Sequence, residues 1–309
     1  MVGREILRLR DEKIALVDTK TVFYCLYFQA IDDQVITDGR VPNIQPGQSK
    51  ALDLPSWLVP KSPPRSRSEV LHPAKFPESL IDQFVDLCTH KGDKIIDPMV
   101  GTGTAVISAI RKNRVGYGVE LSKQFSDIAK TRVANEETFW TQSNVPGFVY
   151  QGDASKLESI SELNDIVFDY MITSPPYWNM LKNPGSENQR NRRQKGLSLV
   201  YSDEERDLGN IDDYNEFLDE LTDVYSNIAD RIRTGGMATI IVKNVKRHHV
   251  VYPIAWDLTQ RLIETGKYRY NGTTFWCQDD IGLKPFAVGI YWVSNTLHHY
   301  CLHFERTAK

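Results

Sequence analysis

The apolar residues of this chain recur with helical spacing in several segments beyond residue 70. Over residues 77–88 they return every three or four positions, which predicts an amphipathic helix. The clearest pattern covers residues 213–233, and Gly235-Gly236 is expected to end that helix, because glycine readily adopts the left-handed conformation that follows many helices. The same spacing predicts shorter helices over residues 104–113, 122–133 and 253–264.

Short apolar runs of the length typical of buried strands lie between these helices. They cover residues 94–97, 115–120, 148–151, 167–172 and 237–242, and the last forty residues are expected to form β-rich pairs. Strands that alternate with helices are typical of a mostly parallel sheet with helices on both faces. The pattern therefore predicts a Rossmann-like α/β fold with a β-rich C-terminal end.

The pattern also divides the chain into three parts. Residues 1–55 alternate short apolar runs with polar turns, which predicts a small strand-rich N-terminal extension. Residues 56–69 are rich in Pro, Ser and Arg, and prolines disfavour regular structure, so a connector is expected there. Residues 70–309 would then form one catalytic domain.

Composition narrows the class of protein. The chain has 309 residues, of which 41% are hydrophobic and 25% charged, as in a soluble globular protein. It has no apolar run near the roughly 20 residues that span a bilayer, and its N-terminus is too charged for a secretory signal, so a cytoplasmic location is expected. Its four scattered cysteines favour neither a disulfide framework nor a zinc site. A net charge of −3 means that a polyanionic partner would need a local basic surface.

Two glycines lie between a predicted strand and a predicted helix, in Asp97-Pro98-Met99-Val100-Gly101-Thr102-Gly103-Thr104. Glycine at such a turn lets the backbone approach a ligand and exposes helix N-terminal amides. In an open parallel sheet, ligands bind outside the carboxyl ends of the strands. The segment is therefore a candidate ligand-binding turn, and a plain strand–turn–helix connection is the alternative.

A carboxylate ends the next predicted strand. Glu120 could accept hydrogen bonds from ribose hydroxyls there, as an acidic residue does in nicotinamide-binding folds. However, Val106 replaces the third glycine of those folds, and Asp97 puts a further carboxylate beside the ligand. A carboxylate repels a pyrophosphate but suits a cationic, amine-bearing ligand.

A second motif, Thr173-Ser174-Pro175-Pro176-Tyr177, follows the predicted strand 167–172. Two consecutive prolines remove two backbone donors and hold the chain extended, so nearby carbonyls are free to accept hydrogen bonds. Such acceptors can hold the hydrogens of an exocyclic amine, and Tyr177 offers a face on which a base can stack. The alternative is a plain Pro-Pro turn at the end of a strand.

The two motifs together resemble those of the DNA amino-methyltransferases, which form N4-methylcytosine or N6-methyladenine. The segment His72-Pro73-Ala74-Lys75-Phe76-Pro77 is similar to that family's cofactor segment, and residues 297–304 are similar to its closing strand. The resemblance covers roughly residues 70–305. It implies the Rossmann-like fold of the S-adenosylmethionine-dependent methyltransferases and S-adenosylmethionine as the cofactor.

The resemblance also assigns roles to matching residues. Glu120 would hold the ribose of the cofactor, and Asp153 would contact its adenine amine. The other cofactor-binding positions would be His72, Lys75, Phe76, Asp97, Pro98, Gly101, Thr102, Gly103 and Thr104. The catalytic positions, which would hold the target base, are Ser174, Pro175, Pro176 and Tyr177. Cytosine-N4 members of the family usually have Ser at the first of these positions, whereas adenine members usually have Asp or Asn, so Ser174 favours cytosine N4.

Basic residues gather in the segment after the second motif. Arg190, Arg192, Arg193 and Lys195 are candidates for nucleic-acid binding, with a solvated surface loop as the alternative. A second basic run, Lys243, Lys246, Arg247, His248 and His249, follows another predicted strand at the same edge of the sheet and could add to it. His298, His299 and His303 should point to different faces of a strand, so no metal site is expected.

The sequence thus favours transfer of a methyl group from S-adenosylmethionine to N4 of a flipped-out cytosine in double-stranded DNA, in a site-specific restriction–modification context with a cognate endonuclease as a functional partner. The alternatives are an adenine-N6 DNA methyltransferase, an RNA amino-methyltransferase and a non-catalytic nucleotide- or DNA-binding module. Cytosine-C5 methylation needs a cysteine nucleophile that normally follows proline, and none of the four cysteines does.

Overall fold

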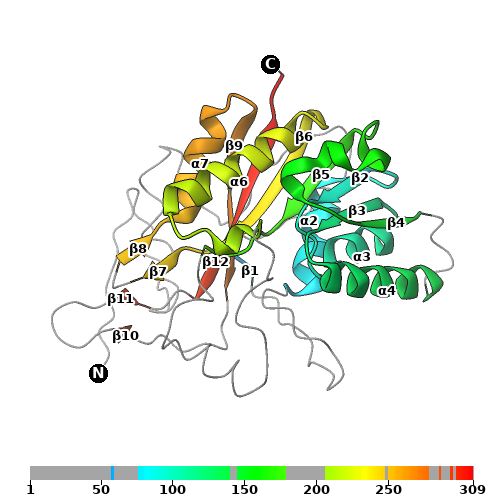
Figure 1. Ribbon diagram of the computed structural model, residues 1–309. Helices are drawn as coiled ribbons and strands as arrows, with labels where there is room; N and C mark the ends of the chain where they lie inside the picture. The colour runs from blue at the N-terminus through cyan, green and yellow to red at the C-terminus, as the bar shows by residue number, and fades with distance from the viewer. Residues whose placement is uncertain are drawn as a thin grey trace, which may run out of the picture. The chain divides into compact units, whose positions relative to one another are not determined.

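A computed structural model describes residues 57–58, 76–139, 145–178, 206–247, 250–277, 285–286, 293–294 and 297–308 (Figure 1). The predicted N-terminal extension, residues 1–55, lies outside these ranges. So does the predicted connector, apart from Trp57 and Leu58, and so does the basic segment that contains Arg190 to Lys195. The predicted division into three parts therefore stays a prediction.

An eight-stranded sheet forms the centre of the described fold. Its strands, in spatial order, are β1 (Trp57–Leu58), β9 (Tyr268–Cys277), β12 (His298–Arg306), β6 (Ile232–Val242), β5 (Phe168–Thr173), β2 (Lys94–Asp97), β3 (Val115–Glu120) and β4 (Gly147–Gln151). β12 runs antiparallel to both β6 and β9, while the remaining neighbours are parallel. Two short antiparallel pairs lie outside this sheet: β7 (Val245–Arg247) with β8 (Val250–Tyr252), and β10 (Pro285–Phe286) with β11 (Val293–Ser294).

Helices cover both faces of the sheet. The helices α2 (Glu78–Cys88), α3 (Thr104–Arg111) and α4 (Lys123–Phe139) pack together on one side, and α6 (Tyr214–Ala229) and α7 (Ile254–Glu264) pack together on the other (Figure 1). Three short 3-10 helices, η1 (Ala154–Ser159), η2 (Ser161–Leu163) and η4 (Leu208–Asn210), complete the described helical structure. The predicted Rossmann-like α/β class, with its β-rich C-terminal end, is confirmed.

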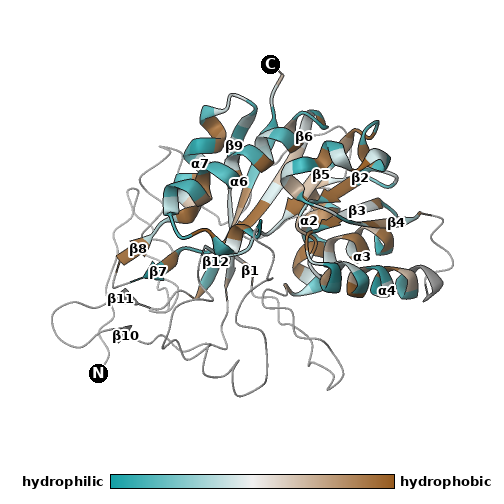
Figure 2. Cartoon of the chain, in the orientation of Figure 1, coloured by the Kyte–Doolittle hydropathy of each residue, from teal (hydrophilic) through white to brown (hydrophobic). Residues whose placement is uncertain are grey.

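Burial explains why these segments form these elements. β2, β3 and β5 are buried along most of their length, and such strands need apolar side chains on both faces. The helices bury one stripe each, as Leu80, Ile81, Phe84 and Val85 do in α2. Figure 2 shows the same division, with hydrophobic residues along the strands and hydrophilic residues on the outward faces of the helices.

A network of ion pairs joins the three helices that lie beside the glycine-containing turn. Arg111 of α3 pairs with Glu78 of α2 at 2.6 Å and with Glu136 of α4 at 2.6 Å. Arg132 of α4 pairs with the same Glu78 at 2.8 Å, and its guanidinium also donates to the hydroxyl of Thr102 at 3.1 Å. The network therefore holds the turn between β2 and α3 in a fixed relation to α2 and α4.

The end of the long helix differs from the prediction. Helix α6 ends at Ala229, and Ile232 already belongs to β6, where it pairs with Phe168 of β5. Gly235 has φ +75° and lies inside β6, beside a register shift between Phe168 and Tyr170 of β5. A side chain at Gly236 would approach the carbonyl oxygen of Asp169 to 2.8 Å. These glycines therefore allow the irregular backbone of β6 and do not end a helix. The predicted helix 213–233 was too long.

Candidate active site

The turn after β2 places backbone amides and one carboxylate at the carboxyl end of the sheet. Asp97 is the last residue of β2 and is only 6% exposed. Gly101 has φ +56° and Gly103 has φ +89°, backbone conformations that residues other than glycine rarely adopt. Gly103 is also the N-cap of α3, and a side chain added there would contact Ala129 at 3.3 Å. The chain can therefore turn sharply over the end of β2 and enter α3.

Glu120 ends the neighbouring strand β3 and is tied to this turn. Its carboxylate accepts hydrogen bonds from the backbone N–H of Gly101 at 2.8 Å and of Ser122 at 2.9 Å, one on each oxygen. Each carboxylate oxygen has a second lone pair, so Glu120 keeps the capacity to accept further hydrogen bonds. Its orientation is fixed before any ligand arrives.

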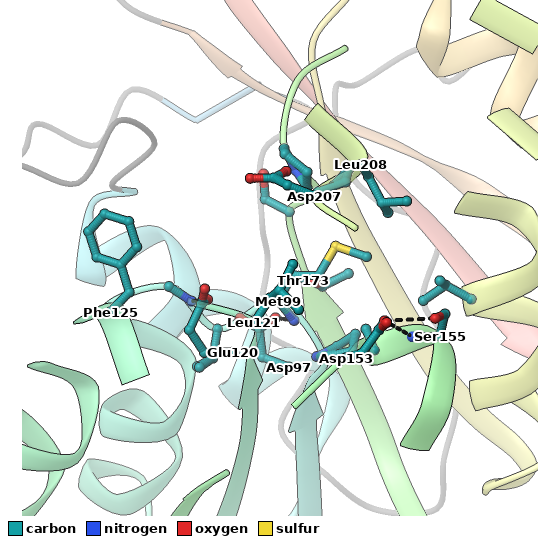
Figure 3. Close-up of a pocket in the computed structure, with 18 of the residues that line it drawn as sticks. Asp97, Met99, Glu120, Leu121, Phe125, Asp153, Ser155, Thr173, Asp207 and Leu208 are labelled. Atoms are coloured by element: carbon teal, nitrogen blue, oxygen red, sulfur yellow. Dashed lines mark hydrogen bonds between the residues drawn. The ribbon is translucent and has the colours of Figure 1, made fainter. Parts of the chain in front are cut away.

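Asp153 lies just after β4 and caps the helix η1. Its Oδ1 accepts hydrogen bonds from the backbone N–H of Ser155 at 2.9 Å and from the Ser155 hydroxyl at 2.7 Å (Figure 3). Its other oxygen lies 3.6 Å from the guanidinium of Arg206. Hydrogen bonds thus hold this carboxylate in place, as they hold that of Glu120. Its Oδ2 lies near the Arg206 guanidinium, beyond hydrogen-bond distance.

The Ser-Pro-Pro segment follows β5, next to β2 in the sheet. Thr173, the last residue of β5, lies next to Asp97, and its side chain acts to lower the pKa of the Asp97 carboxyl. The hydroxyl oxygen of Ser174 is buried and finds no hydrogen-bond partner among the described residues. A buried hydroxyl without a partner costs free energy, so the site is suited to a ligand that supplies one.

Both motifs open onto one cavity of about 380 Å³, within the range typical of small-ligand sites (Figure 3). The residues expected from the sequence that line this cavity are Phe76, Asp97, Pro98, Gly101, Thr102, Thr104, Glu120, Asp153, Ser174, Pro175 and Pro176. They come from the carboxyl ends of β2, β3, β4 and β5 and from the segment before α2. The sheet therefore gathers residues that lie up to 100 positions apart in the chain.

The charge in the cavity is strongly negative. Six acidic side chains line it, namely Asp97, Glu120, Asp153, Asp207, Glu216 and Glu220, against the two basic ones Lys156 and Arg206. Burial raises the pKa of Asp97 to about 7, an effect that the Thr173 side chain and the Met99 amide oppose and the nearby Glu120 adds to. Burial likewise raises the pKa of Glu120 to about 7, against the hydrogen bonds from Ser122 and Gly101 and with a contribution from Asp207. A cation in the cavity would favour the ionised form of both carboxyls.

Several lining residues were not expected from the sequence. Leu121 and Phe125 follow β3, and Asp207 and Leu208 come from the segment before α6 (Figure 3). No local pattern marks Phe125, Asp207 or Leu208, because each reaches the cavity only through the fold. The position of Leu121 directly after Glu120 is the one signal that could have identified a member of this group.

Other expected residues lie elsewhere. His72 and Lys75 fall outside the described residues, as do Arg190, Arg192, Arg193 and Lys195. Gly103 shapes the turn without lining the cavity. Tyr177 is buried, and its ring lies against that of His299, with the centroids 5.9 Å apart and a tilt of 44°.

Two further features bear on the class of protein. In the part of the chain that the structure describes, no cluster of three or more His, Cys, Asp or Glu residues could hold a metal ion. Among the same residues, no helix is long and apolar enough to cross a membrane.

Comparison with known proteins finds a family model that matches part of the chain. Residues 28–131, about a third of the chain, match the family model described as DNA methylase, of the N6/N4 methyltransferase type. The matched segment begins well before residue 70 and contains the glycine turn and Glu120.

Among curated proteins, the chain is 35% identical over 82 residues to the orphan methyltransferase M.BamHII of Bacillus amyloliquefaciens. The aligned segment covers 26% of this chain and 31% of that protein. It is 33% identical over 84 residues to the Type II methyltransferase M.ScaI of Streptomyces caespitosus, and this aligned segment covers 26% of the chain and 28% of the relative. The chain therefore spans less than a third of the length of these relatives.

Among solved structures, a putative rRNA methylase from Clostridium thermocellum superposes with a TM-score of 0.42 at 10% identity, over 75% of this chain and 98% of that one. A magnesium protoporphyrin IX methyltransferase from Synechocystis, solved with bound S-adenosylmethionine, gives a TM-score of 0.41 at 12% identity, over 74% and 79%. The sequence matches, which include the segment that forms one wall of the cavity, show that this part of the chain is similar to the DNA amino-methyltransferases.

Proposed function

We propose that this protein transfers a methyl group from S-adenosylmethionine to N4 of a cytosine that is flipped out of double-stranded DNA. The observation that carries the proposal is the single acidic cavity onto which both motifs open. Asp97 and Ser174 lie 77 positions apart in the chain, yet both line it. A cavity with six acidic and two basic side chains suits a ligand that carries positive charge and donates hydrogen bonds.

The cavity residues fit this cofactor. When bound, S-adenosylmethionine supplies an electrophilic methyl group on a positively charged sulfur. Glu120, already fixed by two backbone donors, has lone pairs left for the two ribose hydroxyls. Asp97 would accept a hydrogen bond from the cationic amine, and Oδ2 of Asp153 would accept one from the adenine amine. The apolar side chains of Leu121 and Leu208, which line the cavity, would contact the adenine ring.

The Ser174 segment holds the target amine. The Ser174 hydroxyl and the carbonyls of Ser174 and Pro175 accept the two amine hydrogens, which turns the nitrogen lone pair toward the methyl group. Rate enhancement then comes mainly from the position of the amine and from charge complementarity. The chain needs no strong base, because a nitrogen that has gained a methyl group readily loses its proton.

The choice of base and nucleic acid rests on further support. Ser174 stands where the resemblance favours cytosine N4, and the similarity to Type II methyltransferases favours DNA in a restriction–modification context. A cognate endonuclease would then be a functional partner. Base flipping supplies access, because the exocyclic amine of a stacked base cannot reach a cavity at the end of the sheet.

Nucleoside analysis tests the proposal. The purified full chain would be incubated with methyl-labelled S-adenosylmethionine and either duplex DNA or RNA, and the digested nucleosides would be separated by mass spectrometry. We expect labelled N4-methylcytosine in DNA. N6-methyladenine would overturn the choice of base, label in RNA alone would overturn the choice of nucleic acid, and 5-methylcytosine or no label in either would overturn the mechanism.

A further inference from the structure

A second group of polar side chains lies at the same end of the sheet, outside the cavity. Tyr300 of β12 pairs with Val242 of β6, so the next residues, His299 and Lys243, lie side by side where the two strands meet the loops. On the other side of β12, His299 pairs with Trp276 of β9, and the two rings stack with centroids 4.3 Å apart. Lys243, His299 and Trp276 thus form a row across three strands.

Lys246 and His298 belong to the same group, and we call Lys243, Lys246, His298 and His299 the cationic cluster. Burial, together with a smaller contribution from the charge of Lys246, lowers the pKa of Lys243 to about 8. Burial lowers the pKa of His298 to about 4, and both lysines contribute. The strand pairing places Lys243 beside His299, and the charge of Lys246 acts on both Lys243 and His298, so the cluster is one electrostatic group.

The two lysines of the cluster have no balancing carboxylate among the described residues. No described carboxylate forms an ion pair with Lys243 or Lys246, whereas Lys112, Lys123 and Lys267 all have such a partner. Lys246 Nζ is enclosed and has no hydrogen-bond partner within the described ranges. Uncompensated buried cations destabilise a fold, so an anion in this place would offset a cost that the free protein bears.

Neighbouring donors point to the same kind of ligand. Trp276 is 6% exposed and Trp178 is 2% exposed, and the indole N–H of each finds no acceptor in the described structure. Nδ1 of His299 is likewise buried without a partner there. Indole and ammonium groups donate hydrogen bonds and cannot accept them. A ligand that satisfies them must therefore be rich in acceptors and negatively charged, as a phosphate is.

The cluster adjoins the segment that holds the target base. The Tyr177 ring lies against His299, and Trp178, the next residue, lies under the guanidinium of Arg247 at 5.3 Å. Figure 1 shows β7, the strand of Lys246 and Arg247, beyond the end of β6. None of the four cluster residues lines the 380 Å³ cavity. The group is thus a separate site next to the catalytic segment.

We propose that the cationic cluster binds one backbone phosphate of the target DNA strand, a phosphodiester group next to the flipped nucleotide. Phosphate contacts fix the position of a protein on nucleic acid, and a flipped nucleotide needs its backbone held on the side from which the base leaves. A phosphate oxygen accepts hydrogen bonds from ammonium, imidazole and indole groups alike. The inference rests on the proposed function for the identity of the ligand.

The test compares Lys246→Met with Lys91→Met in the full chain. Both remove one positive charge, but Lys91 is exposed in the turn before β2, at the opposite end of the strands. We expect Lys246→Met to weaken DNA binding and to reduce the slope of log affinity against log salt by about 0.9, the value for one phosphate contact. Lys246→Arg should restore most of the slope. S-Adenosylmethionine affinity should be unchanged in all variants.

A second readout identifies the contacted group. A set of duplexes, each with one neutral methylphosphonate near the target base, would be bound to the wild type and to Lys246→Met. We expect one position to weaken binding by the wild type and to have no effect on the variant. Without DNA, Lys246→Met should melt at the same or a higher temperature, since it removes a repelled charge. Inorganic phosphate at matched ionic strength should not compete with DNA in the micromolar range.

The possible failures are separable. If the wild type labels no nucleic acid, the proposed function fails. If it methylates DNA but Lys246→Met keeps the full salt slope and the same methylphosphonate profile, the phosphate site is wrong and the proposed function stands. Tight binding of inorganic phosphate, together with equal sensitivity of both proteins to every methylphosphonate, would mean a site for a free anion and would also overturn the inference.

Discussion

Ser174 illustrates how a single residue can be set up for a ligand before that ligand is present. Its hydroxyl is enclosed at the end of β5 and has no partner among the described residues, while the prolines that follow it have no N–H to offer. A buried hydroxyl in this condition costs about 1–3 kcal/mol in proteins. The same hydroxyl becomes useful when an amine enters the cavity and donates to it.

Replacement of Ser174 by Ala should therefore slow catalysis without loss of stability. We expect the rate of methyl transfer to DNA in a single turnover to fall by about a hundredfold to a thousandfold, as is typical when one positioned polar group is removed. Affinity for S-adenosylmethionine and the melting temperature should change little, because no described partner is lost. Ser161→Ala, at an exposed serine in η2, is the matched control and should behave like the wild type. A Ser174→Ala rate equal to that of the control would remove Ser174 from the mechanism.

The ionisation of Asp97 and Glu120 should make both cofactor affinity and fold stability depend on pH. The pKa of each is raised to about 7, mainly by burial, so each gains a proton as the pH falls through 7. A cationic ligand binds the ionised carboxylates more strongly, and affinity should therefore rise with pH up to about 8. Without ligand, pH acts on the free energy of unfolding with the opposite sign. Each raised pKa contributes stability that is present below about pH 4 and is lost as the pH rises through 7.

Calorimetric titration with S-adenosylmethionine at pH 6, 7 and 8 would measure this effect. We expect up to about tenfold weaker binding per pH unit below 7 for each carboxyl that must ionise. Asp97→Asn should bind more weakly and show a shallower pH dependence, because one titrating group is gone. Asp86→Asn, at a partly exposed residue of α2 away from the cavity, should keep the full dependence. An affinity of the wild type that does not vary over this range would contradict the assignment of Asp97 and Glu120.

At the scale of elements, the sequence correctly predicted the boundaries that the local pattern of apolar residues determines. The strands 94–97 and 115–120 were confirmed to the residue, because each is a short apolar run bounded by polar residues. The end of α6 was missed, because Ile232 continues the helical spacing although the chain has already turned into β6. Its pairing with Phe168 of β5, 64 positions away, decides the outcome, and a local pattern contains no information about that partner.

The candidate site follows the same rule. Asp97, Glu120 and Ser174 could be predicted because each lies next to a strand end, and the carboxyl ends of parallel strands meet at one edge. Asp207 and Leu208 could not, since a segment before α6 brings them over the cavity. Lys243 and Lys246 were predicted to lie at the same edge of the sheet as the basic segment. The structure adds that they are partly buried beside His298 and His299, and the pairing of β12 with β6 places Lys243 next to His299.

At the scale of the whole molecule, charge of each sign is concentrated in a different place. The net charge is −3, yet the cavity collects acidic side chains while the cationic cluster and Arg247 collect basic ones at the same end of the sheet. The net negative charge repels DNA, and at physiological salt this repulsion is largely screened beyond about 8 Å. Association with DNA must therefore depend on local basic segments, and the most basic of these is the segment of residues 182–195.

Neutralisation of that segment gives a test at this scale. Replacement of Arg190, Arg192, Arg193 and Lys195 by Gln changes the net charge from −3 to −7. The control replaces Lys91, Lys123, Lys130 and Arg269, all exposed, by Gln and changes the charge equally. If the first four residues contact phosphates, their loss should flatten the salt slope of DNA binding by up to about 3–4, at about 0.9 per contact, whereas the control should weaken binding only through the general increase in repulsion. Affinity for S-adenosylmethionine, measured in parallel, should stay unchanged in the first variant. Equal salt slopes in the two variants would mean that the segment acts only through net charge, and DNA contact would then have to come from the cationic cluster and its neighbours.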